Sequence, residues 1–193
     1  MSISTAPEHD SCHASSSGDS LRLVFPPLVI ATVALVGSLW LSVGMGLKAC
    51  PLCLYQRTFV MGVVAVLGIG LLTGQGHRSV LNFLALPLAV AGFGVAAFHV
   101  FLELTGKLEC PGGVMAIGTA PQQSLAVQTV ILILVSVGVA RSKSCCLPSS
   151  VGAILLGLLF AGSLVVSAPP MPPIPTKAYE QPLDVCRPPY HPQ

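Results

Sequence analysis

Two cysteines separated by two residues, Cys50 and Cys53, have the types and spacing best suited to chemistry in this 193-residue sequence. They belong to the run Cys50-Pro51-Leu52-Cys53-Leu54-Tyr55-Gln56-Arg57, where one long apolar segment ends and the next begins. A CxxC pair binds zinc or exchanges disulfides, and a zinc site needs two further Cys or His ligands at short, regular spacing. No such ligands follow this pair, so the pattern favours redox chemistry.

Pro51 predicts that a helix starts at this cysteine pair, because proline suits the first helical position, where no N–H group is needed. We expect Cys50 and Cys53 in the first turn, beside unpaired backbone N–H groups and the positive end of the helix dipole. That environment favours a thiolate. Arg57 follows Cys53 by four residues, so we expect its cation one turn deeper on the same face, pointing toward the sulfur. A disulfide closed across this spacing in a helix is strained and therefore oxidising.

The octapeptide closely resembles the C-x-x-C-[IWL]-Y-[QE]-R signature of the DsbB/BdbC family of membrane disulfide-generating oxidoreductases. The resemblance implies that the motif opens the second transmembrane helix on the extracytoplasmic side. It also implies that the cysteine pair passes electrons to a bound quinone, either ubiquinone or menaquinone. In this assignment Cys53 faces the quinone ring, Arg57 polarises a quinone oxygen, and Cys50 exchanges with a second cysteine pair.

A histidine in the third apolar run extends the resemblance. The stretch His99-Val100-Phe101-Leu102-Glu103 is similar to the H-x-x-L-[QE] segment of the family, although Phe98 stands where an acidic residue is usual. The resemblance implies that His99 helps to hold the quinone ring, at the depth of Cys53 and Arg57. The other interpretation is a histidine that is simply satisfied at the membrane interface.

The second cysteine pair departs from the family pattern. The family usually carries both of these cysteines in the loop between the third and fourth spans, whereas this loop contains only Cys110. Our hypothesis is that Cys186, in the C-terminal tail, is its partner, and the alternative is that Cys110 forms only transient mixed disulfides. The resemblance implies that electrons pass from a periplasmic DsbA-like thioredoxin-fold oxidase to Cys110 and Cys186, then to Cys50 and Cys53, and then to the quinone pool of the membrane.

Composition identifies the chain as a membrane protein. Hydrophobic residues make up 53% and charged residues 8% of the sequence, whereas charged residues are about 25% of ordinary soluble domains. A net charge of +2 without a basic cluster gives no electrostatic footprint for nucleic acid. We therefore expect an all-α membrane protein, with a four-helix transmembrane bundle as its core and a fifth transmembrane helix.

Five apolar runs define the expected organisation. Residues 1–21 are polar and are predicted to be a disordered cytoplasmic tail, residues 22–168 a transmembrane helical domain, and residues 169–193 a proline-rich extracytoplasmic tail, extended rather than packed. The expected spans are 23–47, 54–73, 80–104, 124–140 and 151–168. A loop is predicted for residues 105–123, and the spacing of Gly92 and Ala96 indicates close packing against a neighbouring helix.

Five spans place the two ends of the chain on opposite sides of the membrane. With the amino terminus inside, Arg78, Arg141 and Lys143 fall in cytoplasmic loops, as the positive-inside rule favours. The same parity separates the cysteines into Cys50, Cys53, Cys110 and Cys186 outside, and Cys12, Cys145 and Cys146 inside. We give the inner group no catalytic role and expect the outer group at the periplasmic face of the inner (cytoplasmic) membrane.

Two other functions fit parts of the sequence. A vitamin-K-epoxide-reductase-like enzyme also links membrane thiols to quinone, but its CxxC pair usually opens the last core helix and its loop cysteines come earlier in the chain. A membrane metal-binding or transport protein would use Cys50, Cys53 and His99 as ligands. Bound metal without quinone reduction would favour that function; our expectation is that the protein holds no metal.

Overall fold

The computed structural model describes residues 17–44, 46, 48–73, 78–113, 117–141, 147–169, 179 and 183–190. Within these residues the secondary structure consists of helices, without a β-strand. The helices are α1 (Ser17–Val43), α2 (Pro51–Leu72), α3 (Arg78–Leu104), α4 (Ala120–Ala140) and α5 (Leu147–Ser167). Each contains an apolar stretch long enough to cross a membrane. The predicted all-α membrane class is confirmed.

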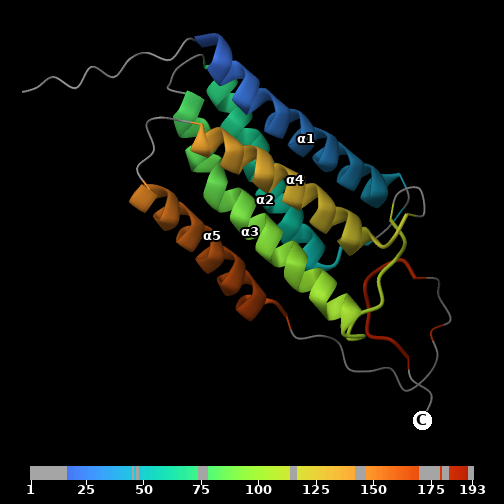
Figure 1. Cartoon of the computed structure of the whole chain (residues 1–193). Helices are drawn as coiled ribbons and strands as arrows, with labels where there is room; N and C mark the ends of the chain where they lie inside the picture. Colours follow the sequence, from blue (N-terminus) through green and yellow to red (C-terminus); the bar gives the residue numbers. More distant parts are fainter. Residues whose placement is uncertain are drawn as a thin grey trace, which may run out of the picture.

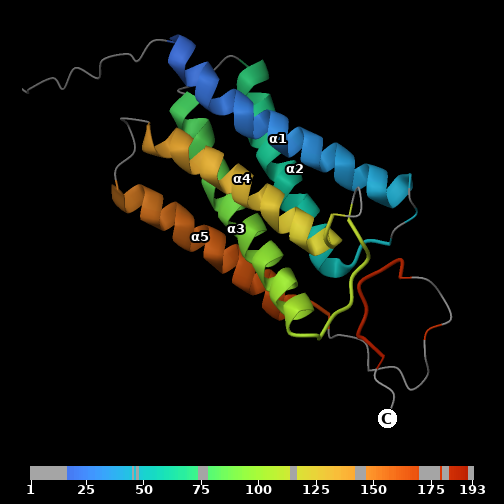
Figure 2. The same cartoon turned by 45° about the vertical axis from the view of Figure 1, so that its right-hand side comes forward.

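Four of the helices form a bundle, and α5 lies on its outside (Figure 1). Helix α3 packs against α2, α4 and α5, while α1 packs against α2 and α4. Two views related by a turn of the molecule both show α1 and α5 on opposite sides of the bundle (Figure 2). This is the predicted four-helix core with a fifth helix.

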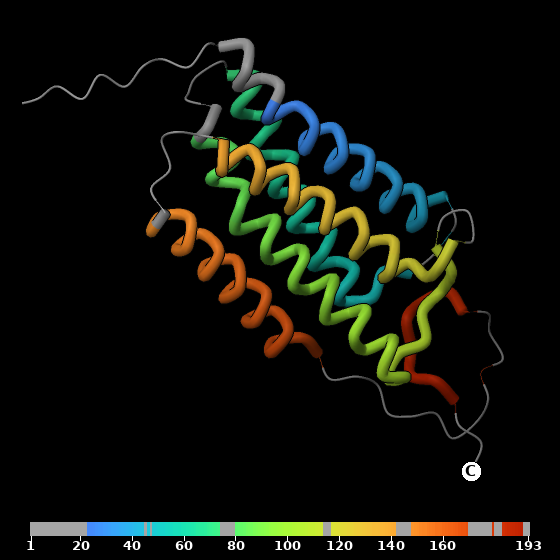
Figure 3. Tube along the Cα trace, in the orientation of Figure 1, coloured from blue at the N-terminus to red at the C-terminus, as the bar shows by residue number. Residues whose placement is uncertain are grey.

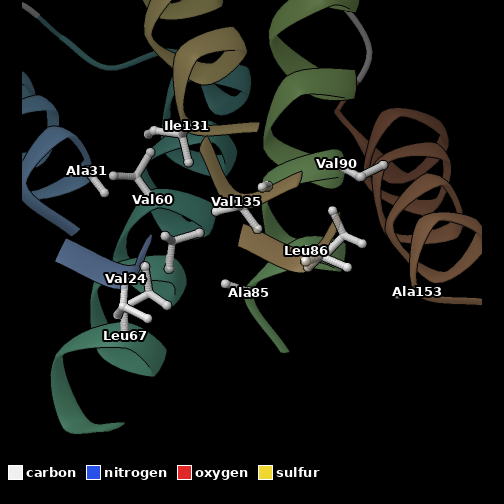
Figure 4. Close-up of a cluster of buried hydrophobic side chains, with 13 residues drawn as sticks. Val24, Ala31, Val60, Leu67, Ala85, Leu86, Val90, Ile131, Val135 and Ala153 are labelled. Atoms are coloured by element: carbon white, nitrogen blue, oxygen red, sulfur yellow. The ribbon is translucent and has the colours of Figure 1, made fainter. Parts of the chain in front are cut away.

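Branched and small side chains fill the interior of the bundle (Figure 4). Leu67 on α2 and Ile131 and Val135 on α4 are completely buried there. The outward faces are apolar as well, because Trp40 on α1 is 67% exposed and Leu159 on α5 is 69% exposed. A surface of this kind suits hydrocarbon rather than water, so both faces of the helices fit a membrane protein.

Glycines allow the helices of the bundle to approach one another closely. A Cβ atom at Gly157 on α5 would lie 2.6 Å from the backbone oxygen of Pro87 on α3, so α5 sits directly against the α3 backbone. A Cβ atom at Gly92 on α3 would lie 2.7 Å from Oε1 of Gln128 on α4. The close approach predicted at Gly92 is confirmed, and small residues are a usual means of helix packing in membranes.

Several helix ends differ from the expected ones. Helix α4 starts at Ala120, so the loop expected for residues 105–123 ends earlier, at Thr119. Pro121 does not prevent this start, because a proline in the first helical turn lacks only an N–H that would be unpaired anyway. Helix α1 starts at Ser17, within the segment expected to be disordered, and residues 1–16 with Cys12 lie outside the described residues.

The described end of the C-terminal tail is packed, so our expectation of an extended, unpacked tail is wrong for residues 183–190. Glu109 and Arg187 form an antiparallel bridge, with N···O distances of 2.8 and 3.0 Å. The Lys48 backbone N–H donates to the Asp184 carbonyl at 2.9 Å, and the Lys48 ammonium, 3.0 Å from the Asp184 carboxylate, lowers the pKa of that carboxyl. Figure 3 shows this red segment beside the loop that links α3 to α4. These partners are far apart in sequence, so a proline-rich composition does not reveal them.

Candidate active site

Cys50 caps the amino terminus of α2. Its backbone is extended (φ −70°, ψ 162°), Pro51 is the first helical residue, and the Cys50 sulfur accepts a hydrogen bond from the Cys53 backbone N–H at 3.3 Å. The cap satisfies one of the unpaired donors at the start of the helix. Cys50 therefore precedes the first turn instead of lying in it, which corrects our expectation by one residue. Cys53 lies in the first turn as expected.

The two sulfurs of this motif interact directly. Sγ of Cys50 lies 2.8 Å from Sγ of Cys53, and both residues are free thiols in this structure. The hydrogen bond with the Cys53 thiol lowers the pKa of Cys50 from 9.0 to about 5, with burial opposing the shift and a hydrogen bond with His99 supporting it. This lowered pKa favours the Cys50 thiolate, the form that attacks disulfides.

A disulfide joins Cys110 to Cys186 across 76 residues of sequence. It connects the loop after α3 to the C-terminal tail, and it is the pairing that our hypothesis predicted for these two residues. Sγ of Cys186 also lies within 4.8 Å of the sulfurs of Cys50 and Cys53 and of a ring nitrogen of His99. Both cysteine pairs are therefore gathered at one end of the bundle, at distances from which sulfur can reach sulfur.

His99 lies behind the two cysteine pairs. It is 0% exposed on α3, and its Nε2 is 3.8 Å from Sγ of Cys50 and 3.6 Å from Sγ of Cys110. Its Nδ1 is 3.2 Å from Nε2 of Gln56, and Oε1 of Gln56 accepts a hydrogen bond from the Ser124 hydroxyl at 2.5 Å. A chain of polar groups thus runs from α4 through α2 and α3 to the sulfurs.

A cavity of about 250 Å³ opens beside Cys53, between α1, α2 and α4. Its walls are mainly apolar, with Leu35, Leu41, Val60 and Val127 among the lining residues. Arg57 contributes a cation to the wall. His99 is not among the residues that line this cavity, whereas Cys53 and Cys186 are. Small-molecule sites are commonly of this kind, apolar with a few convergent polar groups.

Arg57 is held by α1. Its Nε donates to the Ser38 hydroxyl at 3.0 Å, and one Nη donates to the Ser38 carbonyl at 2.9 Å and to the Ser42 hydroxyl at 2.7 Å. We expected the cation to point toward the Cys53 sulfur; these contacts hold the guanidinium against α1, at the wall of the cavity that Cys53 also lines. A basic group within a membrane span normally marks a functional site.

Sequence reasoning missed the polar residues that support this site. Ser38 and Ser42 are four residues apart in the first apolar run, and Ser124 and Gln128 are four apart in the fourth. Residues at this spacing share a helix face. Paired polar residues inside apolar runs were therefore a signal that would have indicated an inward-facing polar stripe on each helix.

Four atoms of the cysteine and histidine cluster are also candidate metal ligands among the described residues. They are the sulfurs of Cys50, Cys53 and Cys186 and a ring nitrogen of His99, all within 4.8 Å of one another. Thiolate and imidazole are ligands that Zn²⁺ prefers. Because Cys186 is bonded to Cys110 here, all four ligands become available only after that disulfide is reduced.

Comparisons with known proteins agree with a redox site. The family model described as "Disulfide bond formation protein DsbB" matches residues 21–131. "Disulfide bond formation protein B 2" of Pseudomonas putida is 38% identical over 86 residues, which cover 43% of this chain and 51% of that protein. "Disulfide bond formation protein C" of Bacillus subtilis is 35% identical over 104 residues, covering 50% of this chain and 72% of that protein.

A relative from Burkholderia pseudomallei, "Disulfide bond formation protein B", is 33% identical over 91 residues, covering 46% of this chain and 53% of that protein. The chain thus spans about half the length of the Pseudomonas and Burkholderia relatives that it matches. No solved structure matches the chain.

Proposed function

Because the chain belongs to the DsbB family of disulfide bond formation proteins, we propose that this multi-pass membrane protein reoxidises a periplasmic DsbA-like oxidase and passes the electrons to quinone. The observation that carries the proposal is the gathering of two cysteine pairs beside a cavity with a cationic wall. One pair is a disulfide and the other a dithiol whose nucleophile is Cys50. The chain therefore holds both reactants of a thiol–disulfide exchange within 4.8 Å of each other.

The position of Cys53 at the cavity supports the following order of electron transfer. The Cys110–Cys186 disulfide accepts two electrons from the dithiol of the partner oxidase, which leaves with a disulfide of its own. The dithiol that results passes the electrons to the Cys50–Cys53 disulfide by exchange. Since Cys53 lines the cavity and Cys50 does not, Cys53 is the cysteine that faces the electron acceptor.

The cavity residues fit a quinone head group. Apolar walls from α1 and α4 suit the ring, and Arg57 supplies N–H donors for a ring oxygen, since its guanidinium is fixed at the wall by Ser38 and Ser42. A quinone bound there supplies the two-electron acceptor of the Cys50 and Cys53 pair. His99 does not line the cavity, so we place it with the cysteines and assign the ring contact to Arg57.

Cys186→Ser tests the proposal. This variant should fail to oxidise a reduced DsbA-like protein, because the acceptor disulfide is missing, while quinone reduction by a small dithiol that reacts at Cys50 and Cys53 continues. Both rates are followed by quinone absorbance on purified protein, with Cys145→Ser as the matched control. Oxidation of the partner at the wild-type rate by Cys186→Ser would remove the tail from the electron path.

Metal binding is the second candidate function, and the observation in its favour is the Cys₃His ligand set described above. Metal analysis of fully reduced protein, together with quinone reduction, decides between the two. Stoichiometric zinc in protein that does not reduce quinone would support a metal-binding role. Rapid quinone reduction by protein treated with a chelator would support the redox role.

A further inference from the structure

Three sulfurs and one histidine nitrogen are arranged as the exchange between the two cysteine pairs requires. Sγ of Cys186 is bonded to Sγ of Cys110 and lies within 4.8 Å of Sγ of Cys50. In such an exchange a terminal sulfur attacks a central one, another terminal sulfur leaves, and the negative charge is shared between the two ends. With Cys186 at the centre, the terminal sulfurs are Cys50 and Cys110.

The Nε2 atom of His99 is within reach of both terminal sulfurs, at 3.8 Å from Cys50 and 3.6 Å from Cys110. A single N–H group there can donate a hydrogen bond to the Cys50 sulfur, which loses negative charge during the exchange, and to the Cys110 sulfur, which gains it. Hydrogen bonds to charged groups are stronger than those between neutral groups. The imidazole is completely buried, so water does not compete for this position.

Two polar side chains determine which ring nitrogen of His99 carries the proton. The Ser124 hydroxyl donates to Oε1 of Gln56, so the amide NH₂ of Gln56 is turned toward Nδ1 of His99, at 3.2 Å. An amide NH₂ group only donates, and Nδ1 must therefore accept. The ring proton is then on Nε2, which faces the sulfurs.

We propose that His99 is the catalytic hydrogen-bond donor of the exchange between the two cysteine pairs, with Cys186 as the central sulfur and with Gln56 and Ser124 as positioning residues. The inference rests on the proposed function, because this exchange is the step that carries electrons from one pair to the other. It gives His99 a role at the sulfurs, although His99 itself does not line the cavity.

The exchange uses only atoms of this chain. The Cys50 thiolate attacks Sγ of Cys186, the Cys50–Cys186 bond forms, and the Cys186–Cys110 bond breaks with its electron pair left on Cys110. The proton stays on Nε2, and its hydrogen bond shifts from the Cys50 sulfur to the Cys110 sulfur. During oxidation of a partner the same step runs in reverse, and the Cys110 thiolate attacks Cys186 and releases Cys50.

The test uses full-length protein with Cys53→Ser, in which the exchange stops at the mixed disulfide because Cys53 cannot displace it. A jump from acidic to alkaline pH starts the reaction, because Cys50 lacks the Cys53 thiol as a hydrogen-bond donor in this background. Acid quenching, alkylation and peptide mapping follow the approach to equilibrium. We expect a disulfide between Cys50 and Cys186. In the same background His99→Phe should slow the approach about 10- to 100-fold, the effect of losing a hydrogen bond to a charged group.

Gln56→Met in that background tests the positioning role. It should slow the exchange about 3- to 10-fold, because a neutral hydrogen bond is lost and the ring is free to move its proton. Nitrogen NMR of protein labelled in histidine should show the Nε2–H form of His99 before the substitution and a mixture of both forms after it. Thr129→Val is the matched control, because that hydroxyl bonds only to the Leu125 carbonyl of its own helix, and its rate should be unchanged.

A mixed disulfide at Cys110 instead of Cys186, or the wild-type rate in His99→Phe, would overturn the proposal. If His99→Phe does not fold, the Gln56→Met variant still decides, since a mixture of ring forms with unchanged exchange would contradict a donor role for Nε2. No quinone or partner protein is present in these measurements. Normal exchange in a protein that fails to reduce quinone would therefore contradict the proposed function and leave this inference standing.

Discussion

Arg57 lies in the membrane-spanning part of α2 and donates three hydrogen bonds to Ser38 and Ser42 on α1. The motif and the cost of a charge in a membrane span marked this position, and the helix spacing placed it near Cys53. Its hydrogen-bond partners Ser38 and Ser42 lie on another helix. Nothing in the local spacing of one helix determines which residues of another helix it meets, so the direction of the guanidinium could not be predicted.

Arg57→Met should lower kcat/KM for quinone about 10- to 100-fold, because a hydrogen bond to a charged group is worth about 1.5 to 3 kcal/mol. Arg57→Lys should recover part of this loss, since it restores the charge without the planar set of donors. Steady-state quinone reduction with a small dithiol measures both variants.

Replacing Arg57 removes both a cation at the cavity and a contact between α1 and α2, and Ser42→Ala distinguishes these two effects. It removes a contact between α1 and α2 but keeps the cation, so it should lower thermal stability more than it lowers kcat/KM. An equal loss of kcat/KM in Ser42→Ala and Arg57→Met would show that Arg57 acts only by joining the two helices.

Cys50 gives a prediction about pH. Because its pKa is lowered from 9.0 to about 5, the thiolate persists as the pH falls from neutral and is lost only as the pH passes through about 5. The alkylation rate of Cys50, measured by peptide mapping, should therefore stay nearly constant below neutrality and fall by half near that value. The alkylation rate of an ordinary cysteine, with a pKa of about 8.5, would already fall steadily with pH below neutrality.

Removing the largest cause of this shift supplies the control. In Cys53→Ser, where a weaker hydroxyl replaces the thiol, the midpoint of Cys50 alkylation should move upward toward 9.0. An unchanged midpoint would show that the Cys53 thiol does not stabilise the Cys50 thiolate.

At the scale of helices, most of the fold could be predicted. The five apolar runs correspond to the five helices, and Pro51 correctly marked the start of α2. The loop predicted for residues 105–123 extends past the start of α4, because Pro121 suits the first turn of a helix. The packed tail was missed because the bridge between Glu109 and Arg187 joins segments far apart in sequence.

Gly157→Ala should weaken the attachment of α5 to α3. The new Cβ would lie 2.6 Å from the Pro87 backbone oxygen, which cannot move aside as a flexible side chain does. We expect unfolding free energy in detergent to fall by about 1 to 3 kcal/mol, as for other overpacked sites, and the yield of the Cys110–Cys186 disulfide to fall with it.

Gly152→Ala, on the same helix, is the matched control. A Cβ there would meet nothing within 4 Å, so this variant should be neutral or stabilise the helix by up to about 1 kcal/mol. Similar thermal midpoints for the two variants would argue against close packing at Gly157.

For the whole molecule, parity of the spans predicted which cysteines would meet. All four cysteines expected outside lie at one end of the bundle in the described residues. Arg141, which we expected inside, directly follows the last residue of α4. The first residue of α4, Ala120, contacts Pro111 at the end that holds the cysteines, so the length of α4 separates Arg141 from them. The network of His99, Gln56 and Ser124 was not predicted, because it needs the relative rotation of three helices, which the order of the spans does not determine.

The sidedness of the protein is tested by a membrane-impermeant thiol reagent on intact cells. After reduction, Cys50, Cys53, Cys110 and Cys186 should be labelled from the periplasmic side. Cys145 and Cys146, which lie outside the described residues, should be labelled only after the membrane is permeabilised. Labelling of Cys186 only in permeabilised cells would contradict both the fifth span and the proposed topology.

The disulfide between Cys110 and Cys186 also closes the segment 110–186, which contains α4 and α5, into a ring. If this bond opens and closes in each turnover, the protein alternates between a looped and a linear polymer. The oxidised chain then contains a covalent loop that the reduced chain lacks. A single cut after Arg141 would leave the looped form as one molecule held together by sulfur. The same cut would divide the linear form into two pieces, which have only helix packing to keep them together in the bilayer.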